Sequence, residues 1–242
     1  MVDFGYSNIP AAEKQARVRA VFNSVASRYD LMNDVMSLGI HRLWKDTLIR
    51  MIAPRPGQQL LDIAGGTGDI AMRFLRHGGG AALVLDINTA MLAAGRQRPQ
   101  RSGFGDRLGW AAGDAEALPL ADDSVDVITI AFGLRNVTDR QAALSEGYRV
   151  LRPGGRFYCL EFSHVRARPL AGLYDLWSSA LPGFGGLIAS DAESYRYLVE
   201  SIRRFPDQEM LAAMFARAGF ARIRHRDLSA GIAAIHCGWK LP

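Results

Sequence analysis

A glycine-rich turn holds the residues of this sequence whose types and spacing most clearly suit ligand chemistry. Residues 60–69 read LLDIAGGTGD, so an apolar run passes into Gly65, Gly66 and Gly68 and then into a helical pattern. Glycine lets the backbone approach a ligand closely, and a strand that ends in such a turn before a helix is typical of a nucleotide-binding crevice. The spacing differs from the G-x-G-x-x-G of dinucleotide sites, which argues against a dehydrogenase. Taken alone, the turn is equally explained as a tight connection without a ligand.

Two carboxylates follow the next two apolar runs. Asp86 ends the run at 81–85, where a carboxylate can accept hydrogen bonds from both hydroxyls of a ribose. Asp114 lies in the segment GDAEALP after the run at 108–111, where a carboxylate could receive an adenine amino group. Either aspartate by itself is also explained as a helix N-cap. Three successive strand ends that each carry the expected feature favour a site for a nucleoside-containing ligand.

The glycine turn also resembles a known loop. Asp62, Ala64, Gly66 and Gly68 are similar to the D-x-G-x-G-x-G loop of class I S-adenosylmethionine-dependent methyltransferases, with alanine in place of the first glycine. The resemblance implies that S-adenosylmethionine binds here as a methyl donor, and that no metal is needed.

Four further segments narrow the class to a family. They are YDLMNDVMSLGIHRLW at 29–44, FGLRNVTD at 132–139, RVLRPGG at 149–155 with EFS at 161–163, and SYRYL at 194–198 with FP at 205–206. Together they resemble the ubiquinone/menaquinone biosynthesis C-methyltransferases, from about residue 4 to residue 240. The family's cofactor contacts then fall on Thr67, Asp86, Asp114 and Ala115. Arg152 stands where lysine is more usual, and Ala131 stands where many members have a serine whose hydroxyl could contact the donor.

The resemblance implies methyl transfer to a ring carbon of a polyprenylated quinol, namely a demethylmenaquinol, a 2-methoxy-6-polyprenyl-1,4-benzoquinol or both. A ring carbon becomes nucleophilic when an adjacent hydroxyl ionises, so the site needs a base or hydrogen-bond donors near that hydroxyl. The catalytic candidates are Arg135 and Asn136, after the fourth strand, and His41, in the N-terminal signature. Arginine is always protonated, so we assign Arg135 an electrostatic role. The alternatives are that Asn136 caps the following helix, that Arg135 pairs with a carboxylate and that His41 fixes the fold of the lid.

The elements that must hold these residues form an alternating α/β pattern. Apolar runs at 59–63, 81–85, 108–111, 125–131 and 156–160 are mostly separated by helical segments, as in a parallel sheet covered on both faces. We predict one domain with a doubly wound, mostly parallel seven-stranded sheet of the Rossmann-like class I methyltransferase type. Its parts are an N-terminal helical lid at 1–56 with helices at 11–26 and 44–52, a donor-binding core at 57–163, an inserted helical cap at 164–206, and, within 207–242, a helix at 207–218 and an antiparallel hairpin of strands 221–228 and 232–240.

Composition limits the other possibilities. The 242 residues are 49% hydrophobic and 22% charged, as in ordinary globular proteins, and no apolar run reaches the ~20 residues that span a bilayer. The net charge of +5 is scattered along the chain, unlike a nucleic-acid-binding tract. Cys159 and Cys237 lack the spacing of metal ligands. We therefore expect a cytoplasmic protein without nucleic acid or metal partners, with peripheral contact at the inner face of the membrane as an open possibility.

Several alternatives stay open at this stage. A prenylated quinol is the expected substrate, while transient contact with a membrane surface or with other quinone-biosynthesis enzymes, and a homodimer, are compatible with the sequence. An O- or N-methyltransferase acting on another phenolic or lipid substrate would share the donor site. A non-catalytic donor-binding scaffold of a quinone-biosynthesis complex would share it too. The choice between benzoquinol and naphthoquinol depends on pocket width, which the sequence does not give.

Overall fold

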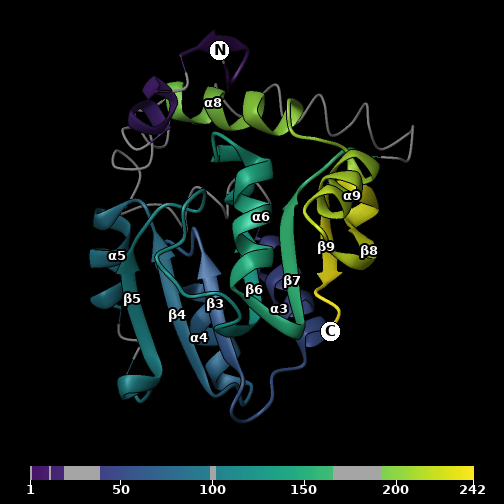
Figure 1. The fold of residues 1–242 in the computed structure, drawn as a ribbon. Helices are drawn as coiled ribbons and strands as arrows, with labels where there is room; N and C mark the ends of the chain where they lie inside the picture. The colour runs from purple at the N-terminus through teal and green to yellow at the C-terminus, as the bar shows by residue number, and fades with distance from the viewer. Residues whose placement is uncertain (1, 11, 19–38, 99–101, 166–191) are drawn as a thin grey trace.

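A seven-stranded sheet with the order β5-β4-β3-β6-β7-β9-β8 organises the chain (Figure 1). The computed structural model describes residues 2–10, 12–18, 39–98, 102–165 and 192–242. The strands are β3 (Gln59–Ile63), β4 (Ala81–Asp86), β5 (Leu108–Ala112), β6 (Val125–Ala131), β7 (Leu151–Phe162), β8 (Ala221–Leu228) and β9 (Ala233–Trp239). The five strands β3 to β7 pair in parallel, whereas β9 is antiparallel to both β7 and β8. The predicted doubly wound, mostly parallel sheet is therefore confirmed, as is the terminal hairpin at its edge.

The fifth strand begins earlier than the apolar run at 156–160 predicts. Leu151 already pairs with Val125, and the register then shifts before Arg156 pairs with Val127. Proline and glycine at 153–155 make this segment look like a turn in the sequence. In the structure the extra residues are absorbed as an irregularity within β7, because pairing resumes on both sides of them.

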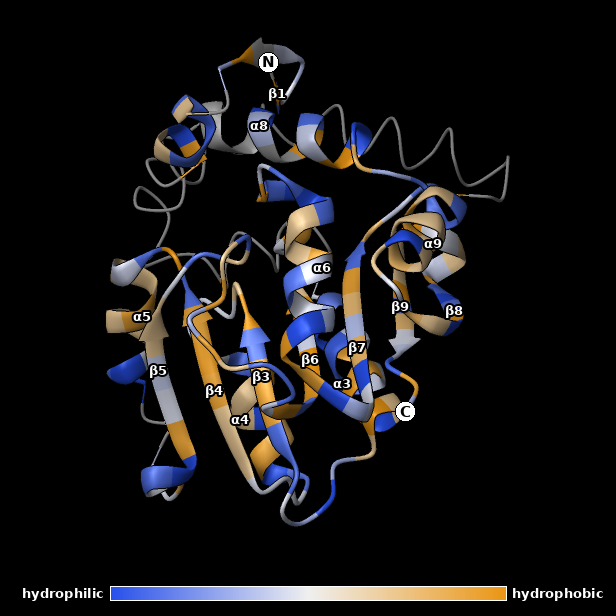
Figure 2. Ribbon diagram, in the orientation of Figure 1, coloured by the Kyte–Doolittle hydropathy of each residue, from blue (hydrophilic) through white to orange (hydrophobic). Residues whose placement is uncertain are grey.

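Helices cover both faces of the sheet. They include α3 (His41–Ile52), α4 (Asp69–Arg76), α5 (Thr89–Arg96), α6 (Arg140–Val150) and α9 (Gln208–Arg217), while α8 (Ala192–Arg203) lies beyond the carboxyl ends of the parallel strands (Figure 1). One apolar core joins α3 and α4 to the sheet through residues such as Leu48 and Phe74, and a second joins α6 and α9 through Leu144 and Phe215. Strand β4 is apolar over most of its length in Figure 2, as expected for a strand buried on both faces.

Local signals set the ends of several helices. The side chain of Asp207 accepts a hydrogen bond from the Met210 backbone N–H and so caps α9, which ends before Gly219 at a φ of +100°. Helix α3 ends at Ile52, just before Pro54, and begins at His41 rather than at the predicted Trp44. Both helices therefore match the sequence prediction closely, with α3 one turn longer at its start.

The N-terminal part of the lid contains a feature that the sequence analysis missed. Strands β1 (Val2–Phe4) and β2 (Ser7–Ile9) form a separate antiparallel pair, followed by a helix over residues 12–18. This segment and α8 lie together beyond the carboxyl ends of the parallel strands (Figure 1). The rest of the predicted lid helix, most of the 29–44 signature and the cap residues 166–191 fall outside the described residues. None of the described helices is long and apolar enough to cross a membrane.

Candidate functional site

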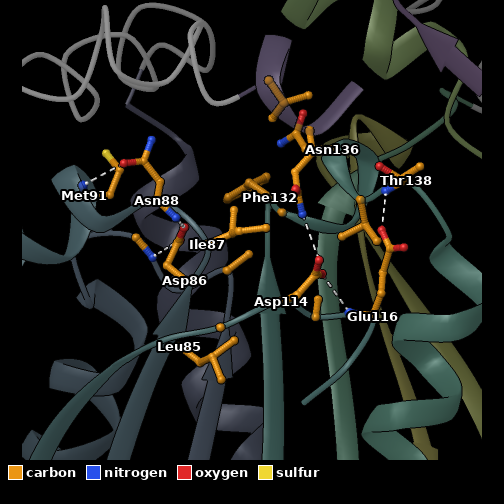
Figure 3. Close-up of a pocket in the computed structure, with 18 residues that line it drawn as sticks. Leu85, Asp86, Ile87, Asn88, Met91, Asp114, Glu116, Phe132, Asn136 and Thr138 are labelled. Carbon is orange, nitrogen blue, oxygen red and sulfur yellow. Dashed lines mark hydrogen bonds between the residues drawn. The ribbon is translucent and has the colours of Figure 1, made fainter. Parts of the chain in front are cut away.

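A pocket opens at the carboxyl ends of four strands, β3, β4, β5 and β6 (Figure 3). Asp86 and Asn88 line one side of it, and Asp114 and Glu116 line the other. The ends of parallel strands meet at one edge of a sheet, which is why residues far apart in sequence converge here. Two carboxylates set between apolar walls suit a ligand that carries hydroxyl or amino groups on a flat apolar body.

The glycine turn adopts backbone angles that its residue types predict. Gly66 and Gly68 have φ values of +54° and +76°, in the left-handed region that favours glycine. A Cβ at Gly68 would lie 2.6 Å from the Trp110 ring, and one at Gly65 would lie 2.8 Å from Asp62 Oδ2. Ala64, at the position where the class I loop has its first glycine, is also left-handed with a φ of 49°. The turn is therefore held so close to its neighbours that side chains there would intrude.

Asp86 is tied to the glycine turn by its carboxylate. Its Oδ2 accepts from the Gly66 backbone N–H at 2.8 Å, and its Oδ1 accepts from the Asn88 backbone N–H at 2.7 Å. Burial raises the pKa of Asp86, against the lowering effect of these backbone hydrogen bonds. Each carboxylate oxygen has a second lone pair, so both can still accept from a ligand in the pocket.

Asp114 joins the pocket to the N-terminal segment. Its Oδ2 accepts from Gln15 Nε2 at 2.8 Å, and its Oδ1 accepts from the Glu116 backbone N–H at 3.0 Å. Gln15 and Val18 both line the pocket, while Ala115, beside Asp114, is buried against it. Gln15 and Val18 therefore bring part of the helix at 12–18 to the edge of the pocket.

A second, smaller cavity lies beside the glycine turn and is lined by Lys45, Asp62, Gly65 and Thr67. Asp62 is 1% exposed, and its Oδ1 accepts from the Thr129 hydroxyl at 2.7 Å. No described residue makes a hydrogen bond to its Oδ2. Burial raises the pKa of Asp62 to about 7, so near neutral pH this carboxyl can bind a proton or accept a hydrogen bond.

Lys45 brings a positive charge to the same cavity. Its Nζ lies 2.9 Å from Asp69 Oδ2, at the first residue of α4. Although burial raises the pKa of Asp69, Lys45 and Arg73 together lower it to about 2. Lys45 is not among the predicted site residues, since a lysine on a helix ordinarily indicates a solvated face.

The predicted catalytic residues fall in three different environments. Asn136 lines the pocket at the end of η4 (Leu134–Asn136), whereas Arg135 and His41 line neither described cavity. Arg135 is 1% exposed, and its Nη1 lies 2.6 Å from Glu161 Oε1 and donates to the Phe132 carbonyl at 2.7 Å. The alternative that Arg135 pairs with a carboxylate is thus confirmed. His41 is buried at the start of α3.

The alternative for Asn136 is wrong. Helix α6 is capped by Asp139, whose side chain accepts from the Ala142 backbone N–H, so Asn136 is not its N-cap. The side chain of Asn136 is instead engaged from α8, where Tyr197 Oη donates to its Oδ1 at 3.1 Å.

The other residues predicted to bind the donor are distributed between the pocket and the smaller cavity. Gly66 lines both cavities, Gly65 and Thr67 line the smaller one, and Gly68, the N-cap residue of α4, lines neither. Lining residues that were not among the predicted site residues include Gln15, Val18, Asn88, Met91, Glu116, Phe132, Val137 and Thr138. Asn88 carried a usable signal, because an Asn before a helical segment predicts the N-cap that it forms on α5.

Comparison with known proteins gives a consistent result. The ubiE/COQ5 methyltransferase family matches residues 11–240. The ubiquinone/menaquinone biosynthesis C-methyltransferase UbiE of Acidiphilium cryptum is 58% identical over 241 residues, which are 99% of this chain and 97% of that protein. The protein of the same name from Methylobacterium nodulans is 57% identical over 245 residues, with 99% of this chain and 96% of that protein covered.

Solved structures resemble the chain in fold. A methyltransferase of Thermotoga maritima, described as a possible histamine N-methyltransferase, has a TM-score of 0.65 at 20% identity and covers 92% of this chain and 99% of its own. A putative methyltransferase in complex with the Trm112 activator of Haloferax volcanii has a TM-score of 0.66 at 18% identity, covering 93% and 98%. At such identities the likeness speaks for the fold alone.

Proposed function

The chain belongs to the ubiE/COQ5 methyltransferase family, and from this membership we propose that it transfers the methyl group of S-adenosylmethionine to a ring carbon of a polyprenylated quinol. The observation that carries the proposal is the 58% identity over 99% of the chain to a protein named as a ubiquinone/menaquinone biosynthesis C-methyltransferase. The ring is that of a demethylmenaquinol, of a methoxy-benzoquinol, or of both.

The described residues fit the donor on chemical grounds. Asp86 has lone pairs that could accept from the two ribose hydroxyls, and Asp114 with Ala115 lines the side of the pocket where the adenine would lie. Asp62 has a buried oxygen without a hydrogen-bond partner among the described residues, and it faces the cavity beside Gly65, where a Cβ would intrude. These two cavities flank Gly66, so one extended ligand can lie along both.

The chemistry divides between the donor and the protein. When bound, S-adenosylmethionine supplies an electrophilic methyl group. The chain must orient the acceptor ring, exclude water and favour the ionised form of the hydroxyl next to the accepting carbon. Asn136 lines the pocket and has the polar side chain needed to bind that oxygen.

Arg135 and His41 act from outside the pocket in this proposal. The guanidinium of Arg135 is held by Glu161 and by the Phe132 carbonyl, so it fixes the short helix that carries Asn136. His41 is buried at the start of α3, one turn before Lys45, which favours its role in fixing the lid.

Incubation with methyl-labelled S-adenosylmethionine tests the proposal. Reduced demethylmenaquinone and a reduced methoxy-prenyl-benzoquinone are supplied separately, and mass spectrometry locates the label in each product. Label on a ring carbon supports the proposal and identifies the accepted ring. Label on oxygen would indicate an O-methyltransferase, and donor binding without transfer to either quinol would indicate a scaffold.

The same proposal includes transient contact with a membrane surface, because the substrate tail is apolar. Ile40 and Leu43, at the start of α3, are 38% and 63% exposed although both are apolar. They lie within one turn of Trp44, whose ring is 6.2 Å from the Phe132 ring of the pocket. Flotation with anionic vesicles checks this contact: Leu43→Asp should lower the bound fraction, and a wild-type protein that never floats would rule the contact out.

A further inference from the structure

The side chain of Asn136 has a buried partner that belongs to neither the glycine turn nor the strand ends. Tyr197, in the middle of α8, donates its hydroxyl hydrogen to Asn136 Oδ1 over 3.1 Å. The two residues are 61 positions apart, and Asn136 lines the pocket. A helix remote in sequence therefore reaches the one predicted catalytic side chain that borders the pocket.

Tyr197 is held firmly on its other side. It is 4% exposed, and its ring stacks on Phe4 of β1 with centroids 4.4 Å apart and planes 25° apart. The same strand pair is tied to α8 one turn further on, where Glu200 Oε2 accepts from the Tyr6 backbone N–H at 2.9 Å. Stacking on one face and burial around the ring leave the phenol hydroxyl aimed at Asn136.

The protonation state of Tyr197 follows from its surroundings. Burial raises the pKa of this phenol well above its ordinary value, with the nearby positive charge of Arg135 working in the opposite direction. The hydroxyl therefore keeps its proton throughout the neutral range and acts as a donor. An asparagine amide has one oxygen acceptor and two N–H donors. The hydrogen bond from Tyr197 to the oxygen fixes the rotation of the amide, and the two N–H donors are the groups that Asn136 can offer to a hydrogen-bond acceptor in the pocket.

We propose that Tyr197 is a positioning residue that fixes the amide of Asn136 so that its N–H groups donate to an oxygen of the acceptor ring. The inference rests on the proposed function and adds to it the group that Asn136 recognises, an oxygen of the acceptor ring. An N–H donor binds an ionised oxygen more strongly than a neutral hydroxyl. Asn136 held in this way therefore favours the ionised quinol, whose hydroxyl proton passes to water, and disfavours rings that carry a donor group in the same place.

Tyr197→Phe is the variant that isolates this hydrogen bond. It keeps the ring that stacks on Phe4 and removes only the hydroxyl. We expect kcat/KM for the quinol to fall about tenfold. The acidic limb of the kcat pH profile, which reports ionisation of the bound quinol, should move up by about one unit, since a tenfold change corresponds to one pH unit. The Kd of S-adenosylmethionine should stay within about twofold of wild type.

Tyr158→Phe is the matched control. Tyr158 is also a buried tyrosine, and its hydroxyl donates to the Met51 carbonyl at 3.1 Å, on α3 and away from the pocket. Loss of that hydroxyl should lower the thermal midpoint of unfolding about as much as Tyr197→Phe does. It should not move the pH profile of quinol methylation. An equal shift of the profile in both variants would overturn the proposal.

A double-mutant cycle with Asn136→Ala shows whether Tyr197 acts through Asn136. Tyr197→Phe should cost nothing further in the Asn136→Ala background, whereas additive losses would contradict the proposal. If Tyr197→Phe does not fold, Phe4→Leu, which removes the stacked ring, should lower kcat/KM in the same direction and to a smaller extent. A wild-type protein that fails to methylate any quinol would refute the proposed function, whereas an unaltered Tyr197→Phe enzyme would refute only this inference.

Discussion

Replacing Asp86 by asparagine tests the donor site most directly. In the structure the two oxygens of this carboxylate hold the backbone N–H groups of Gly66 and Asn88 and line the pocket. The Asp86→Asn side chain keeps one acceptor oxygen, but its NH₂ group faces one of those backbone donors and cannot accept. With Asp86 bound to the ribose as proposed, one charged hydrogen bond to a ribose hydroxyl would be lost, and the other would become a neutral one.

The magnitude follows from those two changes. A hydrogen bond to a charged group contributes about 1.5 to 3 kcal/mol and a neutral one about 0.5 to 1.5 kcal/mol. The combined loss is therefore about 3 kcal/mol, which corresponds to roughly a 100-fold weaker Kd for S-adenosylmethionine at 1.4 kcal/mol per tenfold. Because burial raises the pKa of Asp86, donor affinity of the wild type should also fall as the pH drops through that raised value, and the Asp86→Asn variant should lack this dependence.

Isothermal titration calorimetry of donor binding, with circular dichroism to verify folding, measures the effect. Asp126→Asn is the control, since Asp126 likewise accepts from a backbone N–H, that of Gln59 at 2.8 Å, but at the opposite ends of the strands. Its donor Kd should equal that of the wild type. A folded Asp86→Asn protein whose Kd stays within threefold of wild type would refute the assignment of Asp86 to the ribose.

Three further predictions concern stability. Glu161→Ala leaves the buried charge of Arg135 uncompensated and should lower the free energy of unfolding by about 3 to 5 kcal/mol in urea titrations, whereas a loss below about 1 kcal/mol would contradict the buried pair. Burial lowers the pKa of His236 from 6.5 to about 4, so on acidification the unfolded chain takes up a proton before the folded chain does. The free energy of unfolding should therefore fall between pH 6.5 and pH 4, by about 3 kcal/mol in all. In thermal melts, His236→Gln should remove most of this pH dependence. Ala64→Gly relieves a left-handed alanine at a φ of 49° and should raise the free energy of unfolding by about 1 kcal/mol, while any decrease would count against strain at this position.

Features that depend on residues close together in the sequence could be predicted from it. The strands at 59–63, 125–131 and 221–228 have the predicted limits, because buried apolar runs and the turns around them are local patterns. The cap that Asp207 places on α9 spans only three residues. Asp86 and Asp114 were found in the same way, since each follows a recognisable strand, and the sheet then brings both to one pocket.

Contacts between segments far apart in the chain could not be predicted from the sequence. The β1–β2 pair was missed because strands of three residues each show no usable periodicity. The alternative that Arg135 pairs with a carboxylate was foreseen, but the partner Glu161 was not, since its position depends on the pairing of β6 with β7. Lys45 beside Asp69 depends in the same way on how α3 packs against α4.

The class of fold, the glycine turn and the strand ends that carry Asp86 and Asp114 could be predicted from the sequence, because these follow from residue types a few positions apart. Three contacts became visible only in the folded chain: Arg135 pairs with Glu161 outside the pocket, Gln15 reaches Asp114 across 99 positions, and Tyr197 binds the amide of Asn136. A hydrogen bond requires two atoms to meet within about 3 Å. For residues so far apart in the chain, that distance is fixed only when the sheet, its covering helices and the N-terminal segment have packed together.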